Sequence, residues 1–256
     1  MKLSEARLYS GSGNRFALFD WRKVSQEPTS QWVVEECHFH GVDGVILLCC
    51  SKKAEHRMRI YNANGSEAEM CGNGLRCLGA YLYDLLGTEE MTVETKAATY
   101  KLVVEGRWVG VWVDPSAFKV VQKTLSLSRG TTVNLYCIDT GVPHAVSLVE
   151  SEKEWEAFQI EMVGSEVRFH PEFAPRGTNF TLVYPSTEMV SVATYERGVE
   201  RVTGSCGTGA LAAVAVLVDQ GDVRTEFHIL PPSNEEILIE LKDPNTWLMR
   251  GEVIRE

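Results

Sequence analysis

The sequence predicts an α/β protein of the α+β type, with two pseudo-symmetric lobes that each wrap a mostly antiparallel sheet around a central helix. A repeated motif is the first observation behind this prediction. Cys71-Gly72-Asn73-Gly74 and Cys206-Gly207-Thr208-Gly209 each precede an apolar stretch of helical length, 135 positions apart (206 − 71). Short runs rich in β-forming residues surround both stretches. The length of 256 residues also leaves room for two domains of ordinary size.

The lobe boundaries follow from turn chemistry. We expect residues 1–115 to form the first lobe, joined by the C-terminal strand at residues 247–256, and residues 116–246 to form the second. Asp114-Pro115 is the expected crossing point, because proline cannot continue a central strand. Two helix N-termini would then face one cleft between the lobes, where we expect the active site.

In the first half, residues 10–14 form a glycine-rich stretch that leads into a strand, and turn chemistry alone favours a simple turn there. Thr29 or Ser30 is expected to cap a helix that runs to His40. Leucines at helical spacing after Gly74 predict a second helix, which Gly87 should end. The expected strands are residues 16–19, 45–50, 57–61, 92–94, 100–104 and 108–113.

The second half has a similar succession of predicted strands and helices. Residues 152–158 should form a short helix, and residues 207–218 are apolar on nearly every side, which predicts a fully buried helix. The expected strands are residues 132–138, 145–149, 179–184, 189–195, 225–230, 236–241 and 247–254.

Composition excludes several classes of partner. The net charge of −10 without a basic stripe argues against binding to nucleic acid. Residues 1–7 lack the apolar core of a signal peptide, and no apolar run approaches the ~18 residues that span a bilayer. We therefore expect a cytoplasmic protein with no membrane partner. Seven cysteines at irregular spacings favour reduced thiols over a disulfide framework.

The repeated motif predicts acid/base chemistry. A cysteine at a helix N-terminus lies where unpaired N–H groups and the helix dipole favour negative charge, so its thiol becomes reactive. Two such helix ends can also hold a carboxylate. One thiolate could then remove the α-proton of a bound amino acid while the second thiol donates a proton from the opposite face.

Plainer interpretations compete with this hypothesis. A single Cys-Gly-x-Gly before a helix is more often structural. Residues 207–212 match a loose dinucleotide pattern, but no apolar strand leads directly into them. A zinc site from Cys71, Cys206 and His144 lacks ligand spacing, so we expect no metal. Beside a thiol, His144 or Glu196 could tune its protonation.

The chain resembles the diaminopimelate epimerase family over nearly its whole length. The resemblance rests on ordered blocks: Gly11-Ser12-Gly13-Asn14, Gly41-Val42-Asp43-Gly44, Tyr61-Asn62-Ala63-Asn64-Gly65-Ser66-Glu67, Met70-Cys71-Gly72-Asn73-Gly74-Leu75-Arg76-Cys77, Gly141-Val142-Pro143-His144, Gly177-Thr178-Asn179, Tyr195-Glu196-Arg197-Gly198 and Ser205-Cys206-Gly207-Thr208-Gly209. The family's fold is two pseudo-symmetric α/β lobes, as the repeated motif predicts.

The resemblance implies a cofactor-independent isomerase that interconverts LL- and meso-2,6-diaminopimelate, on the route to lysine and peptidoglycan precursors. It implies that Cys71 and Cys206 are the acid/base thiols, with His144 and Glu196 as auxiliary groups. The implied substrate-binding residues are Asn14, Asn62, Gly72, Asn73, Asn179, Glu196, Arg197, Gly207 and Thr208. Among these, Arg197 suits a distal carboxylate because its guanidinium is a planar fork.

Two positions depart from the family pattern. Arg15 stands where the family usually has an acidic residue, and Val142 where it often has asparagine. Losing that amide predicts looser substrate discrimination, which competition assays with other amino acids test.

Other interpretations of the function stay open. A proline racemase-like enzyme is the nearest alternative, although Asn73 stands where those enzymes have histidine. A redox sensor that pairs Cys71 with Cys206 is a more distant one. Association into a homodimer is also left open.

Overall fold

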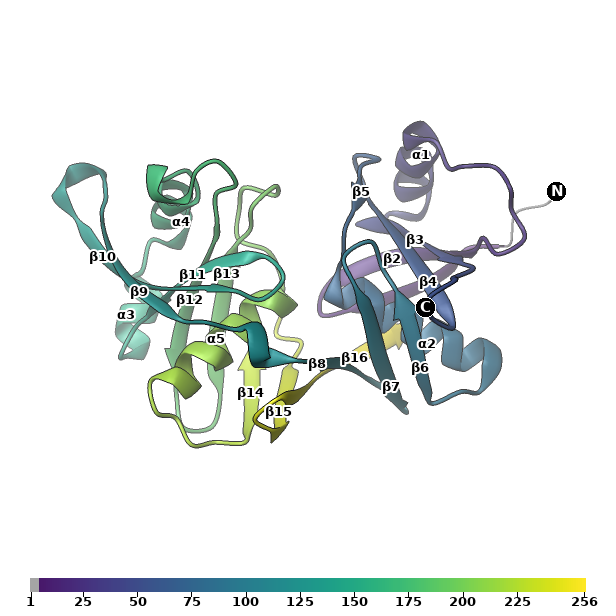
Figure 1. Ribbon diagram of the computed structural model, residues 1–256. Helices are drawn as coiled ribbons and strands as arrows, with labels where there is room; N and C mark the ends of the chain where they lie inside the picture. Colours follow the sequence, from purple (N-terminus) through teal and green to yellow (C-terminus); the bar gives the residue numbers. More distant parts are fainter. Residues whose placement is uncertain (1–4) are drawn as a thin grey trace. The chain divides into compact units, whose positions relative to one another are not determined.

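The structure, a computed structural model, describes residues 5–256. Met1–Ser4, the start of the segment in which we expect no signal peptide, lie outside these residues. The chain forms two compact units (Figure 1): the first is Met1–Val113 with Arg250–Glu256, and the second is Asp114–Met249. That the two units are independent domains stays a prediction.

The first unit is built on a closed ring of eight strands. They are β1 (Arg7–Gly11), β2 (Asn14–Asp20), β3 (Gly44–Cys49), β4 (His56–Asn62), β6 (Glu90–Glu94), β7 (Thr99–Glu105), β8 (Trp108–Val113) and β16 (Thr246–Arg255). They are neighbours in that order, and β16 also pairs with β1, which closes the ring. The short β5 (Glu67–Ala68) adds to β4. The C-terminal strand therefore pairs with the first strand of the chain.

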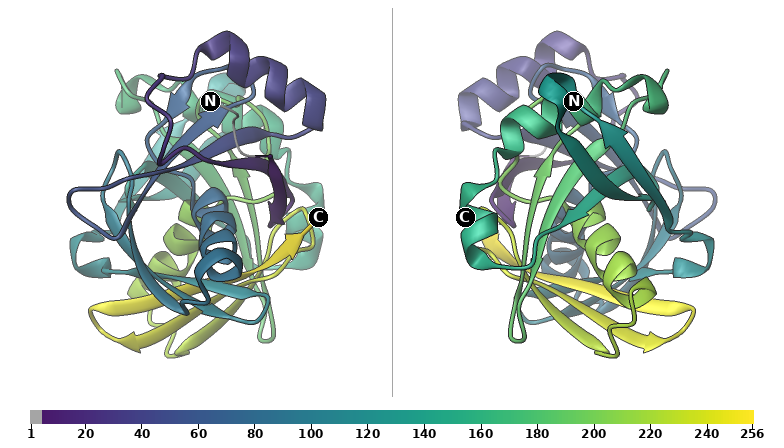
Figure 2. Two further views of the ribbon diagram at one scale, coloured as in Figure 1. Left: turned by 90° about the vertical axis from the view of Figure 1, so that its right-hand side faces the viewer. Right: turned by 90° about the vertical axis from the view of Figure 1, so that its left-hand side faces the viewer.

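Helix α2 (Gly72–Leu86) lies inside this ring of strands (Figure 2, left panel). It contacts β1, β2, β3, β4, β7 and β8. The predicted apolar positions Leu75, Leu78 and Leu82 are all fully buried, each contributing roughly 2 kcal/mol. The helix ends at Gly87 in the left-handed conformation with φ 70°, as predicted. The other helix, α1 (Ser30–His40), begins at Thr29, whose hydroxyl accepts the N–H of Trp32.

The glycine-rich residues 10–14 form a tight hairpin, as turn chemistry predicts. Strand β1 runs to Gly11 and β2 starts at Asn14, so only Ser12 and Gly13 make the turn. Both have positive φ, 50° and 80°, which is the type I′ geometry that matches the twist of paired strands. The sequence predicts the turn but not its type, because serine rarely adopts a positive φ.

The second unit carries an open sheet. Its strands are β9 (Val121–Ser126), β10 (Thr132–Asp139), β11 (Pro143–Leu148), β12 (Asn179–Pro185), β13 (Val190–Tyr195), β14 (Glu226–Leu230), β15 (Ile237–Asp243) and the first part of β16. Neighbours follow the order β16-β15-β14-β13-β12-β11-β10-β9. The helices are α3 (Glu152–Ala157), α4 (Ile160–Arg168) and α5 (Gly207–Asp219), with short 3₁₀ turns at Pro115–Ala117, Ser128–Gly130 and Pro171–Phe173.

Helix α5 holds the central place in this unit. It contacts β10, β11, β12, β13 and β15, and ten of its residues are buried, as its apolar sequence predicts. Across the sheet from β10 to β15 the pairing is antiparallel, parallel, antiparallel, parallel and antiparallel. The sheet from β1 to β7 has the same succession. The predicted α/β class, with two similar halves around central helices, is therefore confirmed.

Apart from the 3₁₀ turns, four elements were absent from the prediction, namely β1, β5, β9 and α4. Among residues 5–256, no helix has both the length and the apolar character needed to cross a bilayer.

Candidate active site

Cys71 occupies the N-cap of α2, with extended backbone angles (φ −146°, ψ 118°). Its Sγ accepts the backbone N–H of Gly74 at 3.4 Å. A Cβ atom at Gly74 would lie 2.6 Å from Cδ1 of Ile60, so glycine lets the helix start close to the sheet. A sulfur that accepts an N–H at the positive end of a helix dipole is placed to carry negative charge.

A polar network supports this helix start. The Asn73 side-chain amide donates to Oδ1 of Asn14 at 2.8 Å. Its own Oδ1 accepts from the guanidinium of Arg76 at 2.9 Å, and Arg76 also donates to the hydroxyl of Ser12 at 2.5 Å. Arg76 is completely buried, and a Cβ at Gly251 would lie 2.9 Å from its Cζ. The network therefore joins α2 to the β1–β2 turn and lies against β16.

The other predicted residues of this unit have local partners. Asn62, at the exposed end of β4, donates from Nδ2 to the hydroxyl of Ser66 at 3.0 Å. Arg15 donates to both carboxylate oxygens of Glu256 and to the carbonyl of Gly41. Arg15 thus fastens β2 to the end of β16, and the pocket role suggested for it gains no support from these contacts.

Cys206 occupies the N-cap of α5 and is half-buried. Its thiol hydrogen-bonds to the Glu196 carboxylate, and its Sγ lies 3.4 Å from the hydroxyl of Thr208. Burial, and then the charge of Glu196, raise the pKa of the Cys206 thiol well above its usual value. Burial also raises the pKa of Glu196, which accepts from the hydroxyl of Thr203 at 3.0 Å. This side of the protein favours a protonated thiol.

His144 lies on β11 and is 1% exposed. Its Nδ1 is 2.9 Å from the hydroxyl of Thr181, and its Nε2 is 3.0 Å from the hydroxyl of Thr208. Burial, helped by the positive charge of Arg197, lowers the pKa of His144 to about 3. The imidazole is therefore neutral at physiological pH and can act on Cys206 through hydrogen bonds.

Asn179 connects Arg197 to this histidine. Its Oδ1 accepts the backbone N–H of Arg197 at 2.7 Å, and its Nδ2 lies 3.3 Å from Nε2 of His144. The Arg197 guanidinium donates to the carbonyl of Arg176 at 3.3 Å. Val142 is half-buried in the turn between β10 and β11.

Within the second unit, His144, Asn179, Arg197, Thr208, Cys206 and Glu196 form one connected set, and Gly207 is buried beside Met249.

The sequence did not single out Ser12, Arg76, Thr181 or Thr203. Thr181 faces Thr194 across β12 and β13, with hydroxyl oxygens 3.1 Å apart. A signal existed for two of them. Arg76 is the one charged residue among the apolar positions that open α2, and Thr181 interrupts a buried strand. Both patterns mark polar groups that need internal partners.

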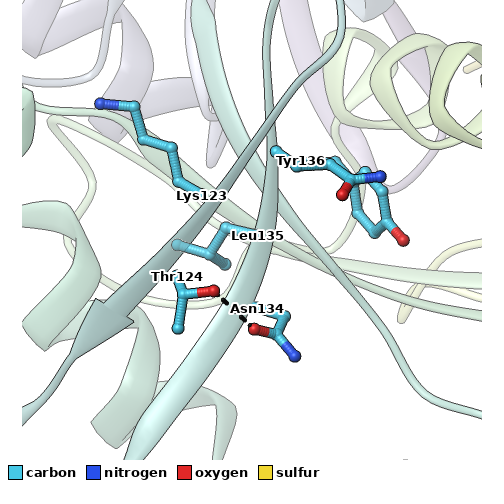
Figure 3. Close-up of a pocket in the computed structure, with 6 residues that line it drawn as sticks. Lys123, Thr124, Asn134, Leu135 and Tyr136 are labelled. Atoms are coloured by element: carbon cyan, nitrogen blue, oxygen red, sulfur yellow. Dashed lines mark hydrogen bonds between the residues drawn. The ribbon is translucent and has the colours of Figure 1, made fainter.

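A pocket of about 310 Å³ lies elsewhere, on β9 and β10. Figure 3 shows Lys123, Thr124, Asn134, Leu135 and Tyr136 along it, with the Thr124 hydroxyl bonded to Oδ1 of Asn134 at 2.8 Å. None of its lining residues belongs to the predicted site. Within each unit, the described residues contain no group of three or more His, Cys, Asp or Glu side chains arranged for a metal. No disulfide joins any of the seven cysteines.

Comparison with known proteins identifies the family to which the chain belongs. The family profile described as diaminopimelate epimerase matches residues 7–113 and 136–255. The chain belongs to the diaminopimelate epimerase family. Diaminopimelate epimerase of Chlamydia muridarum is 36% identical over 250 residues, covering 93% of this chain and 87% of that protein. Membership makes the protein an isomerase of the amino-acid epimerase type.

Two solved structures share the fold. A putative phenazine biosynthesis PhzC/PhzF protein from Clostridium difficile superposes with a TM-score of 0.72 at 10% identity, covering 100% of this chain and 97% of that one. A hydroxyproline epimerase from Agrobacterium vitis has a TM-score of 0.71 at 16% identity, with 98% and 90% covered. At these identities the likeness concerns the fold alone.

Proposed function

We propose that the protein interconverts LL- and meso-2,6-diaminopimelate by moving the α-proton between the thiols of Cys71 and Cys206. One observation carries the proposal. In a chain of the diaminopimelate epimerase family, α2 and α5 each begin with a cysteine at the N-cap, followed by Gly-x-Gly.

The proposed reaction balances without a cofactor. One sulfur, as thiolate, takes the proton from the α-carbon and becomes a thiol. The electron pair left on the carbon is delocalised into the adjacent carboxylate, and the other thiol then donates its proton to the opposite face and becomes a thiolate. The contacts favour Cys206 as the resting thiol, because its surroundings are buried and include the Glu196 carboxylate, and the scheme then makes Cys71 the resting thiolate.

The two helix ends supply the electrostatic part of this proposal. Backbone N–H groups of Gly72, Asn73, Gly207 and Thr208 lie in the first turns of α2 and α5, where no helical carbonyl precedes them as a partner. Such donors hold a carboxylate and stabilise the extra charge that it gains as the α-proton leaves.

The distal end of the substrate would be held by Asn14, Asn62, Asn179 and the Arg197 guanidinium. The local contacts support this in part, because Asn179 fixes the backbone of Arg197 and Asn73 fixes Asn14. Arg197 can meet a distal carboxylate with a two-pronged hydrogen bond. The cytoplasmic location and association into a homodimer stay predictions.

The proposal is tested by α-proton exchange in deuterium oxide with LL-diaminopimelate. The wild-type protein should place deuterium at the inverted carbon. Cys71→Ser and Cys206→Ser should each lose inversion by at least about a thousandfold, since a serine hydroxyl is a far weaker acid and its alkoxide is not formed at neutral pH.

Cys50→Ser is the matched control, because Cys50 is exposed and lies outside both helix starts. It should retain wild-type exchange. Inversion that survives in Cys71→Ser would overturn the two-thiol scheme, and turnover of another amino acid in preference to diaminopimelate would overturn the substrate assignment.

A further inference from the structure

The hydroxyl of Thr208 lies between two groups of unlike chemistry. Its Oγ1 is 3.4 Å from Sγ of Cys206 and 3.0 Å from Nε2 of His144. A threonine hydroxyl has one hydrogen, so it can donate to only one of these neighbours at a time. Which neighbour receives the hydrogen depends on the protonation of both.

The hydrogen bonds of Asn179 determine which tautomer His144 adopts. Oδ1 of Asn179 accepts the Arg197 N–H at 2.7 Å, so the atom that faces His144 at 3.3 Å is the amide nitrogen, which only donates. Nε2 of His144 must therefore carry a lone pair. The ring proton sits on Nδ1 and is donated to the hydroxyl of Thr181 at 2.9 Å.

The burial of His144 keeps the ring neutral, with its one proton on Nδ1. With 1% of its surface exposed and the Arg197 charge nearby, the ring stays neutral, as its lowered pKa of about 3 indicates. Nε2 is thus a permanent acceptor. Thr208 can donate to it while the single hydrogen of the Cys206 thiol goes to the Glu196 carboxylate.

When Cys206 loses its proton, the Thr208 hydroxyl donates more favourably to the sulfur than to His144. A hydrogen bond to a charged acceptor is roughly twice as strong as one between neutral groups. The Thr208 hydroxyl needs only a rotation about its C–O bond to turn its hydrogen from His144 to the sulfur. His144 Nε2 then keeps the bond from Asn179, so neither state leaves that nitrogen without a donor.

We propose that the Thr208 hydroxyl is a two-position hydrogen-bond switch, donating to His144 when Cys206 is a thiol and to the sulfur when Cys206 is a thiolate. This inference rests on the proposed function, in which Cys206 passes through both states in every turnover. Thr208 and His144 are then positioning residues, and the proton itself stays with the sulfur and the substrate. The switch serves both directions of a reversible reaction.

The test measures the pH dependence of Cys206 alkylation by iodoacetamide in a Cys71→Ser background, with the modified cysteine identified by mass spectrometry. Thr208→Val removes the donor to the thiolate, so the pKa of the thiol should rise by about one pH unit, and Thr208→Ser should restore it. His144→Leu removes the resting acceptor, so the thiol pKa should fall. Thr140→Val is the control, because that hydroxyl bonds only the Thr208 carbonyl, and it should change nothing.

Shifts of Thr208→Val and His144→Leu in the same direction, or no shift in Thr208→Val, would overturn the switch. A second measurement needs no variant of the network. In ¹⁵N-histidine NMR at pH 7, His144 should show a protonated Nδ1 and a bare Nε2, and the opposite tautomer would also overturn the proposal. Neither readout depends on turnover, so a failed epimerase assay would leave this result to be judged separately.

Discussion

The starts of α2 and α5 have the same backbone design and different side chains around the thiol. Each begins with a cysteine at the N-cap and glycines at the first and third helical positions. Asn73 in α2 corresponds to Thr208 in α5. Asn73 bonds Asn14 and Arg76, away from the sulfur, whereas the hydroxyl of Thr208 lies against the sulfur of Cys206.

The strands behind the two helices differ in the same way. The first paired residues of β2 and β3 are Phe16 and Gly44, and those of β11 and β12 are His144 and Asn179. An apolar pair in the first unit thus corresponds to a hydrogen-bonded polar pair in the second. One helix start uses its polar groups to hold the scaffold, and the other uses them to adjust a thiol.

The largest expected difference is at the fifth position after each cysteine, which is Arg76 in α2 and Leu211 in α5. Arg76→Met would leave the Ser12 hydroxyl and Oδ1 of Asn73 without their buried donor. We expect it to lower the free energy of unfolding by about 3 kcal/mol. Urea denaturation followed by circular dichroism measures this.

Leu211→Met is the matched control, because it keeps volume and polarity in a buried site and should cost less than about 1.5 kcal/mol. Equal losses in the two variants would show that the polar network around Arg76 contributes nothing beyond packing.

The next effect is a pH dependence of stability that comes from His144 in the second unit. The pKa of His144 is about 3 in the folded protein against an ordinary 6.5, so the unfolded chain binds the proton more readily between these values. Stability is therefore greatest above pH 6.5 and falls by at most about 1.4 kcal/mol per pH unit as the pH drops toward 3.

Urea unfolding of wild type and His144→Gln at pH 6.5, 5.5 and 4.5 measures the contribution of His144 to the free energy of unfolding. The difference in unfolding free energy between the two proteins should shrink as the pH falls. Parallel curves would mean that His144 is not held neutral.

The smallest expected effect is a difference in stability between alanine variants at the third helical positions, Gly74 and Gly209. A Cβ at Gly74 would meet the flexible end of Ile60 at 2.6 Å, and one at Gly209 would meet the hydroxyl of Thr194 at 2.4 Å. Thr194 can move its oxygen only by rotating about χ1, which would break its hydrogen bond to Thr181. We expect Gly209→Ala to cost about 1 kcal/mol more than Gly74→Ala in thermal unfolding. The reverse order would place the tighter constraint in the first unit.

The elements with strong local signals were predictable from the sequence. Helix α2 has regular leucine spacing and a C-terminal glycine, and α5 is apolar on all sides. The missed elements lack such signals. Strand β9 is largely polar, and α4 contains Gly164, which is needed because a Cβ there would lie 2.7 Å from Tyr195. Tertiary packing decides such segments, and local propensity does not describe it.

The same limit applies to the site. The cysteines were predictable because a motif of adjacent residues places them at helix starts. The partners of His144 were not, since Thr181 and Thr208 come from a strand and a helix 27 positions apart (208 − 181). The pairing of β11 with β12 places Thr181 beside the His144 ring, and the packing of α5 on β11 brings Thr208 to its other side.

Strand β16 has a consequence for how the protein is made. Its last residues pair with β1, so that Tyr9 meets Arg255, 246 positions later (255 − 9). The unit that leaves the ribosome first therefore receives its closing strand last, after the second unit's sheet is already synthesised. Until then β1 presents an unpaired edge, which is the kind of surface that nascent chains must keep from sticking to one another.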